Sequence, residues 1–212
     1  MTEPAMRLRP LTADDRELLV GATLDNLNWC GERFTWHDMV QTIEFRHYAD
    51  VLPDRGDFGV VAVDGERVLG LAWALFLGAD DPGYGFVDDA TPEISVWVAE
   101  RTRRRGVGRA VTGALIDEAG RRGIGRLSLS AEAENTAARA LYTSLGFVPV
   151  LGRAVDGVML CEVPSARGRR PSTDRRDPST RRLAALACGS GIGGEARRFG
   201  GGGEARGVPA DP

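Results

Sequence analysis

The stretch RRRGVGRA (residues 103–110) joins three arginines to a Gly-Val-Gly turn. It lies between EISVWV, an apolar run typical of a strand, and GRAVTGALIDEAGRRG, whose apolar residues recur at helical spacing. The first N–H groups of a helix lack acceptors and the helix dipole is positive there, so an anion is stabilised at this position. Gly106 and Gly108 allow a ligand to approach the backbone, and the arginines attract anions. The stretch predicts a phosphate-binding loop, although a solvated turn or a nucleic-acid patch would also contain such residues.

Two widespread phosphate-binding motifs differ from this loop. A Walker A loop ends in Gly-Lys-Ser/Thr, whereas Gly106 is followed here by the sequence VGRA. A dinucleotide-binding fingerprint has a third glycine where this sequence has Val111. The loop therefore belongs to neither class.

The pattern Arg103-x-x-Gly106-x-Gly108 resembles the acyl-CoA pyrophosphate loop of the GNAT superfamily of N-acetyltransferases. A second segment, NTAARALYTSLGF (residues 135–147), resembles the family's Asn-x-x-Ala-x-x-x-Tyr-x-x-x-Gly-Phe segment. The resemblance covers residues 6–163. It implies an α/β fold of GNAT type: a mixed, mostly antiparallel twisted sheet with a central parallel pair, and helices on both faces.

The resemblance also implies how acetyl-CoA would bind as co-substrate. Main-chain groups of Trp97, Val98 and Ala99 would pair with the pantetheine arm like an added strand. Asn135 would bond the pantetheine or a nearby backbone, and it is equally a good helix N-cap. The amides of the loop would hold the pyrophosphate, so the predicted coenzyme loop consists of Arg103, Arg104, Arg105, Gly106, Val107, Gly108 and Arg109.

Two residues are implied as catalytic groups. Tyr142 would protonate the leaving thiolate, although its helical stripe with Ala138 and Leu145 also suits plain core packing. Glu93, at the start of EISVWV, resembles the family's frequent glutamate base, while Ser130 occupies the fifth-strand position that some relatives use. A base is wanted because alkyl amines are charged at neutral pH; solvent could serve instead, with Glu93 only a strand-start acid. The amine would attack the thioester directly, without an acyl-enzyme.

Charge narrows the choice of partners. All 27 basic residues are arginines, against 30 acids; residues 165–212 hold 10 and 5 of these, which leaves 17 against 25 and a net −8 for residues 1–164. An acidic body disfavours nucleic acid, whose binding proteins are usually basic. Together with Asp80, Asp81, Asp88 and Asp89 it favours a cationic amine, either a small molecule or a peptide N-terminus, although a solvated acidic loop explains the acids equally. The alternative function is a non-catalytic acyl-CoA-binding regulatory module.

The helices and strands that position these residues are predicted from the spacing of apolar residues and from glycine, proline and capping signals. We expect strands at residues 6–11, on both sides of Asp64-Gly65, and at 93–98, 126–132, 147–151 and 157–163. We expect helices from Thr12, over 36–48, over 108–123 and over 135–146. The central strand–helix–strand unit predicts a right-handed crossover between parallel neighbours, and the hairpins predict antiparallel flanks.

The sequence also predicts the domain bounds, the cellular location, the absence of a metal and the oligomeric state. Residues 1–164 are predicted to form the acetyltransferase domain, and 165–212, rich in Arg, Gly and Pro, a disordered tail. No apolar run approaches the roughly 20 residues that span a bilayer, and the start lacks a signal-peptide core, so we expect a cytoplasmic protein without membrane contact. Scattered cysteines and only two histidines predict no metal site. We expect a monomer or homodimer.

Overall fold

The structure of the protein, a computed structural model, describes residues 6–164. The strands of the described part are β1 (Arg7–Pro10), β2 (Phe58–Asp64), β3 (Arg67–Leu75), β4 (Glu93–Val98), β5 (Arg126–Ser130), β6 (Val148–Pro149) and β7 (Val158–Glu162). They form one seven-stranded sheet in the order β1-β2-β3-β4-β5-β7-β6. The β4–β5 pair is parallel and the other five neighbouring pairs are antiparallel. The predicted mixed sheet with a central parallel pair is therefore confirmed.

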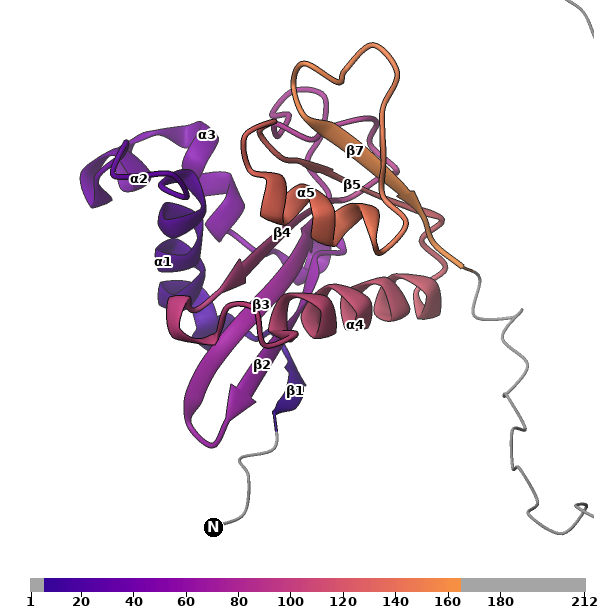
Figure 1. The fold of residues 1–212 in the computed structure, drawn as a ribbon. Coiled ribbons are helices and arrows are strands. Elements are labelled where there is room, and N and C mark those ends of the chain that lie inside the picture. Colours follow the sequence, from indigo (N-terminus) through magenta and orange to yellow (C-terminus); the bar gives the residue numbers. More distant parts are fainter. Residues whose placement is uncertain (1–5, 165–212) are drawn as a thin grey trace, which may run out of the picture. The chain divides into compact units, whose positions relative to one another are not determined.

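Helices cover both faces of this sheet, as predicted (Figure 1). The α-helices are α1 (Arg16–Leu27), α2 (Trp36–Gln41), α3 (Ile43–Arg46), α4 (Val107–Arg121) and α5 (Thr136–Thr143), and the short 3₁₀ helices are η1 (Ala13–Asp15), η2 (His47–Ala49), η3 (Pro53–Arg55) and η4 (Glu100–Thr102). Successive strand residues point to opposite faces. Ala72 and Ala74 of β3 therefore join the core under α4 and α5, while Leu71 and Trp73 join the core under α1–α3.

Helix ends follow the capping signals in the sequence. Thr12 and Asp15 form a capping box, although the first turn is the 3₁₀ helix η1 and α1 begins only after it. Gly123 and Gly146 have positive φ angles of 76° and 96° just beyond α4 and α5, a conformation that glycine adopts without the penalty of a Cβ. Asn135 caps α5, because its side chain accepts a hydrogen bond from the N–H of Ala138 at 3.2 Å.

Two element predictions need correction. The single helix expected over residues 36–48 is divided at Thr42, whose extended conformation (φ −89°, ψ 117°) ends α2 and starts α3. The Thr42 side chain makes no capping hydrogen bond, but its carbonyl accepts the N–H groups of Phe45 and Arg46, both at 3.1 Å, which starts α3. The strands expected over 147–151 and 157–163 shorten to β6 and β7, because residues 151–157 form turns.

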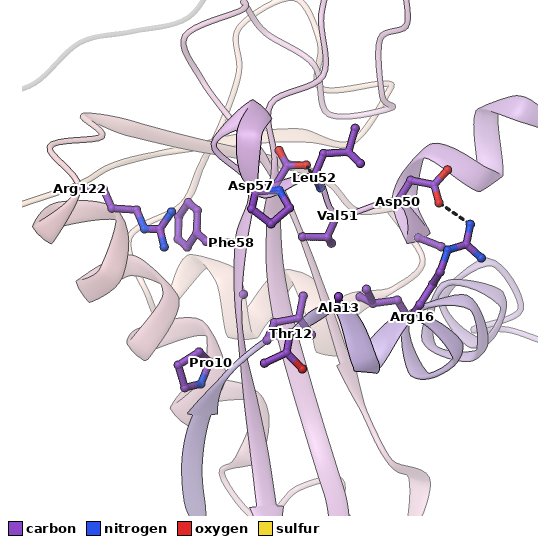
Figure 2. A pocket seen from close by; sticks show the side chains of 15 residues that line it. Pro10, Thr12, Ala13, Arg16, Asp50, Val51, Leu52, Asp57, Phe58 and Arg122 are labelled. Carbon is purple, nitrogen blue, oxygen red and sulfur yellow. Dashed lines mark hydrogen bonds and ion pairs between the residues drawn. The ribbon is translucent and has the colours of Figure 1, made fainter.

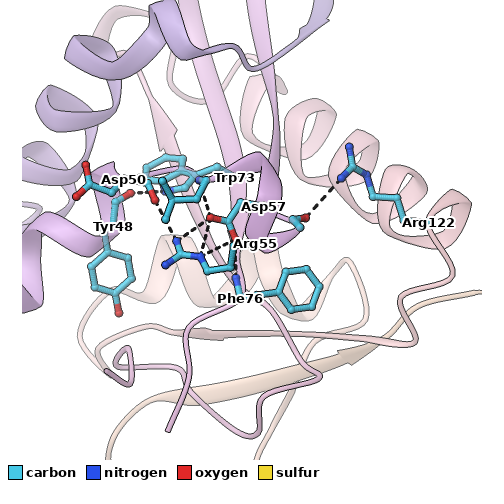
Figure 3. A network of polar contacts seen from close by, with 9 residues as sticks. Tyr48, Asp50, Arg55, Asp57, Trp73, Phe76 and Arg122 are labelled. Atoms are coloured by element: carbon cyan, nitrogen blue, oxygen red, sulfur yellow. Dashed lines mark hydrogen bonds and ion pairs between the residues drawn. The ribbon is translucent and has the colours of Figure 1, made fainter. Parts of the chain in front are cut away.

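A buried carboxylate, Asp57, ties the segment before β2 to the end of β3 (Figure 3). Its oxygens accept hydrogen bonds from the N–H groups of Leu52 and Phe76, both at 2.8 Å. They also accept from the guanidinium of Arg55, at 2.7 Å for the closest pair. Because the Asp57 side chain has no exposed surface, removing its carboxylate leaves buried donors without acceptors.

We predict that Asp57→Ala lowers the free energy of unfolding by about 3–5 kcal/mol, since a buried ion pair is broken and two main-chain donors lose their acceptor. Urea denaturation measures the loss. Asp54→Ala, at an exposed position of η3, is the matched control and should change stability by less than about 0.5 kcal/mol. Equal losses in the two variants would contradict the assigned role of Asp57.

The predicted disordered tail, residues 165–212, lies outside the described residues. Within residues 6–164, no helix is long and apolar enough to cross a membrane. In the same range, no group of three or more histidine, cysteine or acidic side chains could hold a metal ion.

Candidate functional site

The strands β4 and β5 pair over a very short length and then separate. Their register consists of the single pair Glu93–Ser128, next to a hydrogen bond from the N–H of Ser128 to the carbonyl of Pro92 (3.1 Å). Glu93 and Ile94 are buried, but the rest of β4 is half-exposed. A gap thus opens beside the second half of β4, where an unpaired strand edge can pair with an extended ligand.

The register of β4 on β3 determines which main-chain groups face this gap. The N–H of Ala99 donates to the carbonyl of Leu69 (3.0 Å), and Trp97 pairs with Leu71, so residues 97 and 99 direct their groups toward β3. Because strand residues alternate, Val96 and Val98 direct theirs toward the gap. Of the three residues expected to pair with pantetheine, Val98 is therefore the one whose main chain is directed there, and its carbonyl accepts a hydrogen bond from Nε of Arg103 at 3.3 Å. The register adds Val96, which the sequence prediction did not include.

The Gly-Val-Gly loop presents a continuous run of free amides. η4 is held to β3 by the hydroxyl of Thr102, which donates to the carbonyl of Leu69 at 2.8 Å. Arg104 and Gly106 then take positive φ angles of 61° and 82°, which turn the chain into α4. Among the described residues, the N–H groups of residues 104–109 have no acceptor. Such a run of donors at a helix start suits a diphosphate.

Glycines let the start of α4 pack close to its neighbours. A Cβ on Gly70 of β3 would lie 2.9 Å from the side chain of Val107, which is buried in the core. A Cβ on Gly108 would lie 3.1 Å from Leu141 of α5 and 3.4 Å from Val98. The loop is thus placed directly beside α5 and the free edge of β4, while the side chains of Arg103, Arg104, Arg105 and Arg109 are exposed.

Tyr142 lies on α5 within the core that α4 shares with the sheet. It is 8% exposed, and its ring packs against that of Phe147 with centroids 5.7 Å apart. Burial raises the pKa of its hydroxyl to about 12, so the group keeps its proton at neutral pH. Such a hydroxyl can donate a proton, and the same packing also fits the core role that the helical stripe suggested.

Glu93 is buried at the point where β4 and β5 meet. Burial raises the pKa of its carboxyl to about 7, against a hydrogen bond from Tyr48, the nearby N–H of Gly85 and the charge of Arg153, which all lower it. The hydroxyl of Tyr48 donates to Oε1 at 2.9 Å. A carboxyl with a pKa near neutrality can accept a proton at physiological pH. Tyr48 was missed because 45 residues separate it from Glu93 and no local motif marks it.

Three of the four aspartates in the acidic loop before β4 have partners within the protein. Asp81 pairs with His47 at 2.9 Å, and Asp88 pairs with Arg126 at 2.8 Å. Asp89 accepts a hydrogen bond from the N–H of Ala79 at 3.1 Å. These contacts fix the loop, whose Gly83 lies next to Glu93. The aspartates therefore stabilise the loop, whether or not they also attract a cationic ligand.

A cavity of about 300 Å³ lies elsewhere, where β1, α1 and the start of β2 meet (Figure 2). Two of its charged side chains are engaged: Arg16 pairs with Asp50 at 2.6 Å, and the Arg122 guanidinium lies over the ring of Phe58, 4.3 Å from its centroid. None of the residues predicted for the coenzyme or the amine is among its described lining residues. We therefore place the candidate site at the gap between β4 and β5.

Comparison with known proteins identifies the family of the chain. The chain matches the Acetyltransferase (GNAT) family over residues 22–147. The [ribosomal protein bS18]-alanine N-acetyltransferase of Salmonella typhimurium is 40% identical over 111 residues, covering 50% of this chain and 70% of that protein. The mycothiol acetyltransferase of Beutenbergia cavernae is 44% identical over 72 residues, covering 34% of this chain but only 24% of that protein.

Solved structures share the fold. The proposed acetyltransferase yncA of Salmonella typhimurium, solved with its cofactor acetyl-CoA, superposes with a TM-score of 0.51 at 25% identity. That match covers 76% of this chain and 95% of yncA. The chain thus matches nearly the full length of this structural neighbour, whereas it spans between 24% and 40% of the mycothiol acetyltransferases it resembles.

Proposed function

Because this chain belongs to the GNAT acetyltransferase family, we propose that it moves an acetyl group from acetyl-CoA to a primary amine. The observation that carries the proposal is the run of unpaired amides at residues 104–109, placed beside the free edge of β4. The free amides suit the diphosphate of the coenzyme, and the free edge of β4 suits its amide-bearing arm. We also propose that residues 1–164 form the catalytic domain and that it acts as a monomer or homodimer.

The residues of the gap would hold acetyl-CoA as follows. The amides of residues 104–109 and the side chains of the loop arginines bind the diphosphate, while main-chain groups of Val96 and Val98 pair with the arm. Asn135, already the cap of α5, keeps the start of that helix in place beside the gap. The co-substrate supplies an acetyl thioester, which the amine attacks directly.

Two buried side chains handle the protons. Glu93 faces the core under α1–α3, since it alternates with Ile94, which belongs to the core under α4 and α5. Tyr142 belongs to that second core, so the two groups approach the gap from opposite faces of the sheet. Glu93 takes a proton from the ammonium or from a water beside it, and Tyr142 gives its proton to the leaving thiolate.

The amine is proposed to be cationic, either a small molecule or a peptide N-terminus. The net charge of −8 on residues 1–164 supports this choice. The matched relatives include an enzyme named for the alanine of a ribosomal protein and others named for mycothiol, so the relatives do not restrict the acceptor to one size. Rates with a cationic acceptor should fall as salt screens the attraction.

The proposal is tested by measuring release of free CoA from acetyl-CoA with a panel of amines, beside calorimetric titration with CoA. Binding of CoA with amine-dependent thiol release is the expected result. Binding without release for every amine would favour the alternative, a non-catalytic acyl-CoA-binding regulatory module. Absence of CoA binding would overturn both.

We predict that Tyr142→Phe lowers kcat by about 10²-fold while the KM for acetyl-CoA stays unchanged, because only the proton donor is removed and the ring remains in the core. Initial rates of CoA release at saturating amine measure the change. The pKa of about 12 implies that Tyr142 produces no alkaline limb in the accessible pH range. An unchanged kcat would reduce Tyr142 to a packing residue.

A further inference from the structure

Among the described residues, Tyr48 is the side chain that donates a hydrogen bond to the Glu93 carboxylate, and it does so at Oε1; the N–H of Gly85 also lies near this carboxylate. We infer that Tyr48 is a positioning residue for the base: it fixes Oε1 of Glu93 and thereby directs Oε2 toward the acceptor. The inference rests on the proposed function, in which Glu93 accepts the proton. It assigns a role to a side chain that lies far from both motifs of the sequence.

A directed pair of hydrogen bonds supports the holding of Oε1. The main-chain N–H of Tyr84 donates to the hydroxyl oxygen of Tyr48 at 2.7 Å, and this hydroxyl donates to Oε1 of Glu93 at 2.9 Å. Because an N–H can only donate, the Tyr48 hydroxyl accepts from it and directs its own proton to the carboxylate, the acceptor within reach. Hydrogen bonds in such a chain polarise and strengthen one another, most of all where water is excluded.

The Tyr48 ring is itself immobilised. It is 6% exposed, stacks on the ring of Tyr84 at 6.1 Å, and meets the ring of His47 edge-on at 4.4 Å. Its carbonyl accepts a hydrogen bond from the indole N–H of Trp73 at 2.8 Å, which anchors the backbone to β3 (Figure 3). The hydroxyl is therefore carried by a rigid support, as a group that orients a base must be.

The second oxygen of Glu93, Oε2, lacks the hydrogen bond that holds Oε1. Oε2 is buried and accepts no hydrogen bond from the described residues. It faces Gly83, where a Cβ would lie 2.1 Å away, so any side chain at position 83 would displace the carboxylate. A buried, unpaired carboxylate oxygen is costly unless a donor arrives, and an ammonium or a water beside it is such a donor.

Other titratable groups surround the pair and enter its pH dependence. Arg153 lowers the pKa of the Glu93 carboxyl by its charge. His47, which precedes Tyr48, pairs with Asp81 on the loop above, and Tyr84 lies on that same loop. Removing the Tyr48 hydroxyl leaves the main-chain N–H of Tyr84 without its acceptor but changes none of these side chains, so a change in the profile reports the hydrogen bond to Glu93.

The test compares Tyr48→Phe with Thr23→Val. Both variants delete one buried hydroxyl in the core under α1–α3, but the hydroxyl of Thr23 has no hydrogen-bond partner in the described structure. Loss of a hydrogen bond to a charged group should move the acid limb of kcat/KM up by about one to two pH units in Tyr48→Phe. Near pH 6 the rate falls by about tenfold or more, and it recovers toward that of the unsubstituted protein as pH rises. Thr23→Val keeps the original limb.

A loss of activity in Tyr48→Phe that is equal at every pH would overturn the inference, because a merely structural role has that signature. A second readout separates the inference from the proposed function. In protein labelled with ¹³C-glutamate and free of acetyl-CoA, the carboxyl signal that disappears in Glu93→Gln is titrated by NMR. A higher pKa in Tyr48→Phe supports the inference, even if no amine were acetylated and the proposed function failed. An unchanged pKa beside normal acetyl transfer overturns the inference alone.

Discussion

Glu93→Gln lowers kcat/KM for the amine by about 10²–10⁴-fold, the contribution expected of a positioned base. The amide keeps the size of the side chain but cannot accept the proton of an ammonium. It also keeps an oxygen that can accept the hydrogen bond from Tyr48, so the surrounding structure is preserved. Steady-state release of CoA across a range of amine concentrations measures the change.

The effect of Glu93→Gln on the rate depends on pH. The pKa of Glu93 is raised to about 7, so the base is increasingly protonated below pH 7 and the rate of the unsubstituted protein falls there. The ratio between the two proteins is therefore largest above pH 7, and it narrows again where the amine becomes neutral in solution. Glu66→Gln, at an exposed position in the β2–β3 turn, is the control and keeps the full profile. A Glu93→Gln variant with the same limb near pH 7 would show that another group, or solvent, is the base.

Gly108→Val raises the KM for acetyl-CoA by about 10- to 100-fold, corresponding to about 1.4–2.8 kcal/mol of binding free energy. A Cβ at this position already lies 3.1 Å from Leu141 and 3.4 Å from Val98. The two further methyl groups of valine must therefore push α5 away or occupy the space beside the free amides. Calorimetric titration with CoA measures the affinity without requiring turnover.

The matched control is Gly113→Val on the same helix. A Cβ at position 113 would meet nothing within 4 Å beyond the helix itself, so valine there changes helix propensity in the same way without touching the loop. Its affinity for CoA should equal that of the unsubstituted protein. Equal weakening in both variants would mean that helix stability, and not space at the amides, controls binding.

The parts of the site that the sequence predicted are those contained in single short stretches. The glycine loop and the segment from Asn135 to Tyr142 each lie within one turn and one helix, so spacing along the chain determines their placement. Tyr48 comes from η2 and reaches Glu93 only through packing of the helical layer, which spacing cannot reveal. The choice of Val96 over Trp97 depended on the register between β3 and β4, because a shift by one residue exchanges the groups that face the gap.

The fold shows the same division. The strand–helix–strand unit around α4 and the β2–β3 hairpin were predictable, since apolar periodicity and the Asp64-Gly65 turn signal are local. The break at Thr42 was not, because residues 36–48 carry a helical pattern on both sides of it. There the extended conformation of Thr42 interrupts the helix, and Tyr48, six residues later, is buried in the core.

The sheet keeps the two hydrophobic layers apart: the proposed coenzyme loop adjoins the layer of α4 and α5, and Tyr48, the partner of Glu93, belongs to the layer of α1–α3. Residues of α1, α2 and the loop over Glu93 can thus be substituted without disturbing the packing of α4 on the sheet. Under the proposed function, the choice of amine acceptor could therefore change in evolution while the acyl donor stays the same. A laboratory campaign to retarget the protein should accordingly randomise residues of the layer of α1 and α2, keep Tyr48 and Glu93, and leave the layer of α4 and α5 intact.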